Sequence, residues 1–150
     1  MPKIMFLTPT LDAKVGYDYC VSMVQTAEAL RAKGIGVDLM FLAGCAAMDR
    51  SRDILMNEFM SSDCTHMMQI DSDLGWDALD IIKLGSHDVE FVSGVYPVKQ
   101  HEPKFLVNFN TNRREGLLGA DVAKKVPSLY NKGGHVDVRG GIGAMARSVM

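Results

Sequence analysis

Two aspartates one residue apart, Asp71 and Asp73, form the pattern in this sequence that most directly suggests chemistry. They follow the apolar run 67–70, and side chains two positions apart in an extended segment point the same way, so both carboxylates can face one ligand. Two carboxylates at close range repel each other, and a hard cation such as Mg²⁺ or Mn²⁺ relieves that repulsion. Such a cation fills its remaining positions with water and phosphate oxygens. The pair therefore predicts a divalent-cation site, and the alternative is a solvated turn that caps the next helix.

The segments around the aspartates predict the elements that position them. Apolar runs indicate four strands, at 3–7, 37–42, 65–70 and 89–95. Helical spacing and flanking glycines indicate helices over 18–33, from about 51 onward, and over 77–84 with Asp77 as cap. The residues 8–10 are expected to be a loop that ends the first strand. The last residues, 144–150, are expected to begin a further helix.

The apolar positions of each helix predict its buried face. In the first helix these are Tyr19, Cys20, Met23, Val24, Ala27 and Leu30. In the second they are Ile54, Leu55, Phe59 and one of Met56 and Met60. In the short helix after the aspartates they are Leu79, Ile81, Ile82 and Leu84.

Alternating strands and helices predict an α/β fold around a mostly parallel sheet. Units of this kind connect with the same hand, so the loops after successive strands gather at one edge of the sheet. Ligands of open α/β sheets bind at that carboxyl edge. We therefore expect the segments 8–10, 43–53 and 71–73 to lie close together, with Thr10, Arg52 and Asp73 around one cleft.

Composition supports one globular domain without a nucleic-acid or membrane partner. Of the 150 residues, 47% are hydrophobic and 23% are charged, which argues against disorder. The formal net charge of -2 gives no electrostatic reason to expect binding to nucleic acid. The apolar run near the N-terminus is too short for a signal peptide or a membrane span. The three cysteines show no CxxC spacing, so we expect a cytoplasmic protein in a reducing compartment.

Residues 65–99 resemble the DxD region of GT-A glycosyltransferases, especially compact family-2-like bacterial and viral members. The motifs that carry the resemblance are Asp71-Ser72-Asp73, Leu74-Gly75-Trp76, the acid-capped helix 77–84 and Ser93-Gly94-Val95-Tyr96-Pro97. The resemblance implies a Rossmann-like sandwich with a mostly parallel central sheet flanked by helices. It also implies a hexosyltransferase-type enzyme that moves a sugar from a nucleotide-diphosphate sugar to an acceptor, with Mn²⁺ or Mg²⁺ as cofactor.

The resemblance assigns roles to residues on the donor side. Asp73 would coordinate the cation directly, while Asp71 would coordinate it too, or act through water or on the ribose. Ser72, between them, would contact the nucleotide sugar. The loop that cradles base and ribose matches Thr8, Pro9 and Thr10. The stretch 49–53 resembles the Ala-Arg-Asn segment of such enzymes, with an aspartate where asparagine is common, and the residues it would place at the nucleotide are Arg50, Arg52 and Asp53.

Two aromatic residues have both a functional and a structural interpretation. Trp76, the only tryptophan, either lines the sugar or acceptor site or packs beneath the metal loop. Tyr96 follows the fourth strand within reach of the same cleft, and a structural turn explains it equally well.

The acceptor side has fewer candidates. His135 resembles a late histidine that some family members bring to the metal, with a surface loop as the alternative. An inverting transferase needs a carboxylate base, for which Asp137 is the nearby candidate; otherwise the base comes from elsewhere or the mechanism is retaining. We expect one GT-A-like domain over 1–150, with a nucleotide-sugar part at 1–99 and an acceptor part at 100–150. A second copy or a partner chain is an alternative source of the rest of the acceptor site.

Two other functions stay open at this point. A nucleotidyltransferase of related fold would use the same metal chemistry, but it usually carries a glycine-rich, basic loop after the first strand. The residues 8–16 contain one lysine and one glycine. The other alternative is a non-catalytic nucleotide-sugar-binding module or fragment. The acceptor, whether glycan, lipid or protein, is not readable from the sequence.

Overall fold

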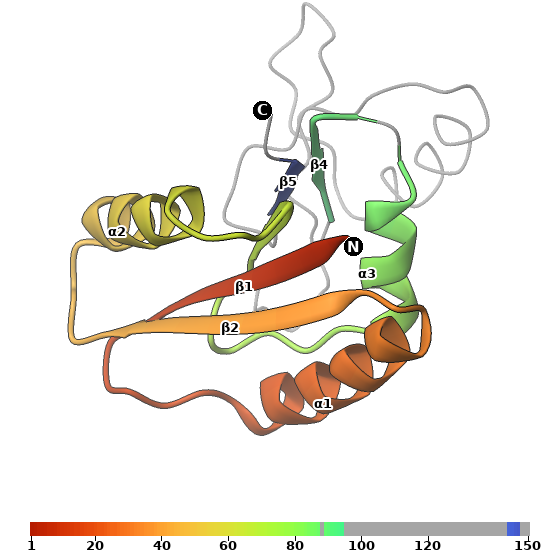
Figure 1. Cartoon of the computed structure of the whole chain (residues 1–150). Coiled ribbons are helices and arrows are strands. Elements are labelled where there is room, and N and C mark those ends of the chain that lie inside the picture. Colours follow the sequence, from red (N-terminus) through yellow and green to blue (C-terminus); the bar gives the residue numbers. More distant parts are fainter. Residues whose placement is uncertain (88, 95–143, 148–150) are drawn as a thin grey trace, which may run out of the picture. The chain divides into compact units, whose positions relative to one another are not determined.

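A five-stranded sheet with helices on both faces forms the described part of the chain (Figure 1). The structure, a computed structural model, describes residues 1–87, 89–94 and 144–147. By contacts the chain divides into two units, Met1–Gly94 with Gly143–Met150, and Val95–Ile142. The second unit lies outside the described residues, so the fold and the site below belong to the first.

The sheet has the order β2-β1-β3-β5-β4, and its first three strands in this order are parallel. Strand β1 (Lys3–Thr10) runs parallel to β2 (Gly36–Ala43) and to β3 (His66–Gln69). Strand β5 (Ala144–Arg147) lies between β3 and β4 (Phe91–Ser93) and is antiparallel to both. The predicted mostly parallel α/β sheet is therefore confirmed at the level of an α/β fold with three parallel strands, compatible with a Rossmann-like arrangement.

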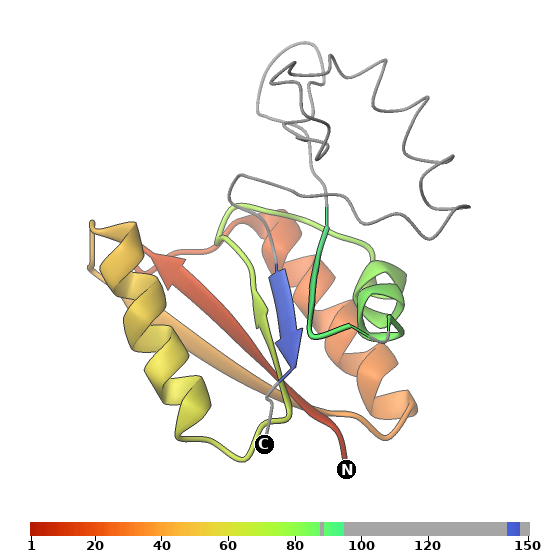
Figure 2. The same cartoon turned by 90° about the horizontal axis from the view of Figure 1, so that it is seen from above.

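The helices form a layer on each face of the sheet (Figure 2). Helices α1 (Tyr17–Ala32) and α3 (Ala78–Gly85) cover one face, and α2 (Met48–Met60) covers the other. Residues of β1 alternate between the two layers: Ile4 and Phe6 pack with α1 and α3, while Met5 and Leu7 pack with α2. A central strand covered on both faces is apolar at every position, which is why 4–7 is an uninterrupted apolar run.

The first strand continues through the residues predicted to be a loop. Thr8-Pro9-Thr10 pair with β2 up to Thr10↔Ala43, so the prediction of a loop there was wrong. Pairing with β3 ends at Leu7↔Gln69, and beyond it β1 is bonded on one side only. A proline lacks an N–H for the ladder and is tolerated where a strand has one neighbour, so the run does not stop at Pro9.

The buried face of α1 differs from the predicted one. Cys20 is exposed and Val24 is 69% exposed, while the hydroxyl residues Ser22 and Thr26 are buried in their place. Both hydroxyls bond to Trp76, as described below, and a satisfied hydroxyl can replace an apolar side chain in a core. The predicted Tyr19, Met23 and Leu30 are buried and Ala27 packs against the core, so the prediction was wrong only for Cys20 and Val24.

The ends of the helices follow the predicted signals more closely. Helix α1 stops before Gly34, whose φ of 71° suits glycine, and Asp77 caps α3 by accepting a hydrogen bond from the Leu79 N–H at 2.8 Å. Helix α2 begins at Met48, ahead of the predicted start near Ser51. Among the predicted inward residues, Met56 packs against the core, whereas Met60 and Leu79 are 69% and 68% exposed.

The expected helix at the end of the chain is a strand instead. Residues 144–147 form β5, which bonds to β3 on one side and to β4 on the other. A helix of a few residues is marginal in water, whereas a strand inserted between two others satisfies its backbone groups on both sides. The prediction of a helix at 144–150 was therefore wrong for the part that the structure describes.

Among the described residues, no helix has both the length and the apolar character needed to cross a membrane.

Candidate functional site

Three loops meet at the carboxyl edge of the parallel strands. The Gly44 N–H after β2 donates to the Thr10 carbonyl at 3.1 Å, and the Gly16 N–H before α1 donates to the Ser72 carbonyl at 2.7 Å. A third contact joins Arg52 of α2 to Asp71, two residues after the end of β3. The prediction that the segments 8–10, 43–53 and 71–73 converge is thus confirmed by contacts between them.

An ion pair joins helix α2 to the aspartate loop, defined here as residues 71–75. The Arg52 Nη2 group donates to Asp71 Oδ1 at 3.2 Å, with side-chain exposures of 34% and 28%. Arg50 and Asp53, from the same helix, are exposed. The sequence assigned Arg52 to the donor side, and the structure places it against one of the two predicted metal ligands.

The aspartate loop turns sharply after β3 and is held from the α1 side. The Leu74 N–H donates to the Asp71 carbonyl at 3.3 Å, which closes a turn over 71–74. Within this turn Ser72 is half-buried and Asp73 is exposed. The Ser72 carbonyl points back to the Gly16 N–H, so the loop before α1 fixes the backbone that carries both aspartates.

Gly75 is required where the loop passes the first turn of α1. A Cβ atom at this position would lie 2.8 Å from the Cβ of Asp18, closer than two such atoms approach in proteins. The Asp18 Cβ is fixed by its backbone, so a side chain at residue 75 forces one of the two segments to move. Sequence reasoning included Gly75 in the Leu-Gly-Trp motif but gave it no role; no pattern pointed to the close approach.

Trp76 anchors the end of the aspartate loop to α1. Its backbone N–H donates to Ser22 Oγ at 2.8 Å, Ser22 donates back to its carbonyl at 2.7 Å, and its indole Nε1 donates to Thr26 Oγ1 at 2.8 Å. Its ring meets the ring of Tyr19 edge-on, with centroids 5.1 Å apart. These contacts give Trp76 a packing role beneath the loop, and its predicted contact with a sugar stays a prediction.

The three residues matched to the base-binding loop are buried at the end of β1. Thr8 is fully buried and its hydroxyl shares a 2.7 Å hydrogen bond with the Tyr19 hydroxyl. Burial raises the pKa of Tyr19, so this phenol stays protonated at neutral pH. Pro9 is buried as well, and Thr10 is 6% exposed. Their predicted contact with base and ribose stays a prediction.

The loop between β1 and α1 contains a strained residue that sequence reasoning missed. Ala13 has a φ of 59°, a conformation that alanine adopts rarely. The Thr10 hydroxyl spans this turn, since it donates to the Lys14 carbonyl at 2.7 Å and accepts from the Lys14 N–H at 3.2 Å. Non-glycine residues held in this conformation cluster at functional sites, and this one lies in a loop at the carboxyl edge of the parallel strands.

Tyr96, His135 and Asp137 lie outside the described residues. Their predicted places at the sugar, the metal and the acceptor stay predictions.

The aspartate pair has the chemistry that a hard divalent cation requires. Asp71 and Asp73 offer carboxylate oxygens, and Mg²⁺ held by one or two carboxylates keeps water and phosphate oxygens as its other ligands. The Oδ1 atom of Asp71 already accepts a hydrogen bond from Arg52. A cation at Asp71 would therefore lie close to the Arg52 guanidinium, which has the same sign of charge.

The chain matches no protein-family model, and no curated protein shows significant similarity to it.

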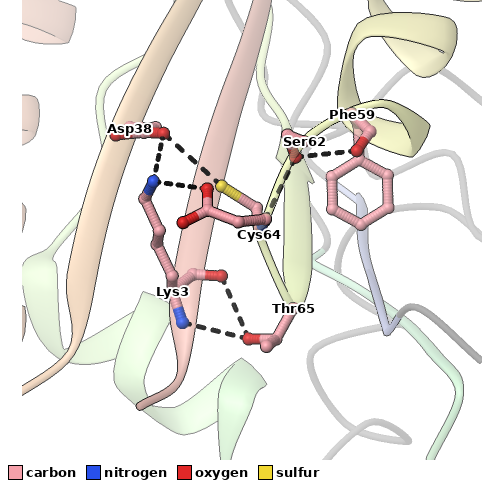
Figure 3. Close-up of polar contacts among 7 residues, drawn as sticks. Lys3, Asp38, Phe59, Ser62, Cys64 and Thr65 are labelled. Carbon is pink, nitrogen blue, oxygen red and sulfur yellow. Dashed lines mark hydrogen bonds and ion pairs between the residues drawn. The ribbon is translucent and has the colours of Figure 1, made fainter. Parts of the chain in front are cut away.

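A second group of potential metal ligands lies at the opposite end of the strands. Asp38, Asp63 and Cys64 place one donor atom each within 4.8 Å of one another. Lys3 Nζ already lies between the two carboxylates, 2.8 Å from Asp38 and 2.7 Å from Asp63 (Figure 3). These hydrogen bonds raise the pKa of Lys3 above its ordinary value, and burial raises the pKa of the Cys64 thiol. The Lys3 ammonium already neutralises both carboxylates, and the Cys64 thiol is protonated. This group of residues therefore does not fit a resident cation.

Proposed function

We propose that the chain binds a nucleoside-diphosphate sugar together with Mn²⁺ or Mg²⁺ at the carboxyl edge of its parallel strands, and transfers the sugar as a GT-A-type glycosyltransferase. The donor would lie over the aspartate loop, between the loop before α1 and the beginning of α2.

The contact between Arg52 and Asp71 carries the proposal. The two residues are distant in sequence, yet their side chains meet at 3.2 Å where the predicted donor site should lie. An arginine beside a pair of carboxylates offers complementary halves for a metal diphosphate: the carboxylates suit the cation, and the guanidinium fork suits phosphate oxygens. The resemblance of residues 65–99 to the DxD region supports the same assignment.

Each residue at this edge has a defined task under the proposal. Asp73, the exposed member of the pair, holds the cation, and Asp71 supports it. When bound, the cation supplies Lewis-acid stabilisation of the charge on the departing nucleotide. Arg52 orients the diphosphate, and the hydrogen bond from Gly16 to Ser72 holds the aspartate loop in place.

A nucleotidyltransferase is less consistent with the first loop. Such an enzyme grips a triphosphate with basic side chains and glycines after the first strand. Here Lys14 is 80% exposed and forms an ion pair with Asp12 at 3.1 Å, and this pair lowers the pKa of Asp12. The loop thus pairs its lysine with a neighbouring carboxylate.

Turnover of a donor panel tests the proposal. The full chain is incubated with UDP-, GDP-, CDP- and ADP-linked sugars in Mn²⁺, with a chelator control, and the released products are measured with water as acceptor. We expect cation-dependent release of a nucleoside diphosphate from at least one donor, lost in Asp73→Ala. In a parallel incubation with a sugar phosphate and a nucleoside triphosphate, formation of a nucleotide sugar with release of pyrophosphate would favour the nucleotidyltransferase. Donor binding without release would favour a binding module.

A further inference from the structure

The Arg52–Asp71 pair leaves most of the guanidinium available. Arginine has five N–H donors in a planar fork, and within the described residues Arg52 uses one of them, on Asp71 Oδ1. With about a third of its side chain exposed, Arg52 can turn toward a ligand at the edge without leaving a buried core position. A single contact in a pair that solvent still reaches on both sides contributes little, so its exchange for a better partner costs little.

The beginning of α2 offers a second feature that suits an anion. The helix begins at Met48, and its N-cap residue, Ala47, makes no side-chain hydrogen bond to the first turn. The first N–H groups of a helix have no partners within the helix and carry partial positive charge. Arg52 lies in the second turn of this helix, so its charge and the helix dipole both favour an anion at this end of α2.

A guanidinium and a divalent cation compete for the single negative charge of Asp71. Both are positive, so a cation at Asp71 is repelled by the guanidinium that already bonds to Oδ1. A cation alone has to displace Arg52 or bind against this repulsion. A diphosphate that binds Arg52 removes this obstacle, because it takes over the guanidinium and offers oxygens to the cation as well.

We infer that Arg52 is the internal counter-ion of Asp71 and is exchanged for the cation when a diphosphate binds, so that cation and nucleoside diphosphate bind with positive coupling. This inference rests on the proposed function and adds to it that the cation binds weakly until the nucleotide arrives. Coupling between two ligands is reciprocal, so the cation must tighten the nucleotide by the same factor as the nucleotide tightens the cation.

Titration of Mn²⁺ without nucleotide gives the first test, with free Mn²⁺ followed by its electron paramagnetic resonance signal. Arg52→Gln removes the competing charge and should bind Mn²⁺ about two- to fivefold more tightly than the wild type. Arg50→Gln removes the same charge from an exposed position of the same helix that makes no described contact with Asp71. It should therefore show a smaller gain in Mn²⁺ affinity, because it removes a positive charge from the surface without breaking the ion pair.

Two further measurements separate the ion pair from a general effect of charge. In an Asp71→Asn background, Arg52→Gln should give no more gain in Mn²⁺ affinity than Arg50→Gln. With UDP, GDP, CDP or ADP present, whichever binds, the wild type should gain more in Mn²⁺ affinity than Arg52→Gln does, since the variant has no guanidinium to release.

The outcomes distinguish this inference from the proposed function. Equal Mn²⁺ affinity in Arg52→Gln and Arg50→Gln overturns the exchange, even if nucleotide binding still depends on Asp73. No binding of any nucleoside diphosphate to the wild type in Mn²⁺ overturns the proposed function itself. A larger gain in Mn²⁺ affinity for Arg52→Gln than for Arg50→Gln, with weaker coupling to the nucleotide, supports the exchange and the proposed function.

Discussion

At the residue scale, the Lys3 group, defined as Lys3 with its carboxylate partners Asp38 and Asp63, shows how charge is used away from the proposed site. One ammonium at the start of β1 bonds to Asp38 of β2 and to Asp63 just before β3, so it ties the amino ends of three parallel strands together. Thr65 adds to this, since its hydroxyl accepts from the Lys3 backbone N–H at 3.0 Å and donates to the Lys3 carbonyl at 3.1 Å. The group stabilises the sheet at the end opposite to Asp71.

The pH dependence of the stability that the Lys3 group contributes is predictable from the directions of the pKa shifts. The hydrogen bond from Lys3 lowers the pKa of Asp63 below its ordinary value of 3.8, so its contribution is present above that pH and is lost as pH falls through the lowered value. The raised pKa of Lys3 keeps its contribution intact below the ordinary value of 10.5. Lys3→Met should therefore lower stability by a constant amount between about pH 5 and pH 9, and by less in acid.

Urea denaturation across this range measures the difference between wild type and variant. Lys33→Met removes an exposed lysine at the end of α1 and serves as the matched control, with little effect expected. A difference for Lys3→Met that changes between about pH 5 and pH 9 would show that another group governs the stability of this end.

Single residues also explain where sequence reasoning about the core failed. Ser22 and Thr26 are polar, so a search for apolar positions skipped them in favour of Cys20 and Val24. Their burial depends on bonds to Trp76, which lies 50 or more positions away in the sequence. A partner that distant leaves no mark on the local pattern of the helix.

At the element scale, the close approach of the aspartate loop to α1 predicts the effect of a substitution. Gly75→Ala places a Cβ atom 2.8 Å from the Asp18 Cβ, so the loop or the helix must shift. We expect a loss of about 1–3 kcal/mol in the free energy of unfolding, as for other overpacked positions.

A double mutant and a nearby glycine test whether the loss comes from the contact between residue 75 and Asp18. Asp18→Gly removes the opposing Cβ, so the double mutant should lose less than the sum of the two single changes. At Gly16 an added Cβ would make only ordinary contacts of 3.5 and 3.6 Å, so Gly16→Ala should be nearly neutral. Strict additivity of Gly75→Ala and Asp18→Gly would mean that the two segments do not meet as described.

The cap of α3 provides a second prediction for an element. The Asp77 side chain accepts from the Leu79 N–H at 2.8 Å, and loss of such a cap costs about 0.5–2 kcal/mol. Asp77→Ala should lower the unfolding free energy by that amount in denaturant titrations. Asp80→Ala, in the first turn of the same helix but not its cap, should cost less; an equal loss would point to helix-terminal charge rather than capping.

The order of the first seven elements was predictable because each carries its own local signal. Apolar runs marked β1 to β3, and glycine or aspartate marked the ends of α1 and α3. Strand β5 has no such signal: its residues 144–147 suit a helix by propensity, and its two partners, β3 and β4, lie far upstream. Pairing across that distance overrides local propensity, which is why the sequence suggested a helix.

At the scale of the whole molecule, the topology explains how the candidate site could be foreseen. Three parallel strands with right-handed connections must deliver the loops after them to one edge. The contacts from Gly44 to Thr10, from Gly16 to Ser72 and from Arg52 to Asp71 follow from that rule. What the rule does not supply is the partner of each side chain, such as the ion pair that Arg52 forms with Asp71.

The melting temperature of the full chain in Mn²⁺ with a panel of nucleoside diphosphates tests the central claim most directly. We predict that one of them raises the melting temperature, with about 2.7 kcal/mol of stabilisation at a hundredfold excess over its dissociation constant. Asp73→Ala should abolish the part of this increase that depends on Mn²⁺, as should a chelator. Asp63→Ala, from the second group of acidic residues, should retain it. Equal Mn²⁺-dependent stabilisation of the wild type and Asp73→Ala would contradict the account, and a loss confined to Asp63→Ala would move the cation to the other end of the strands.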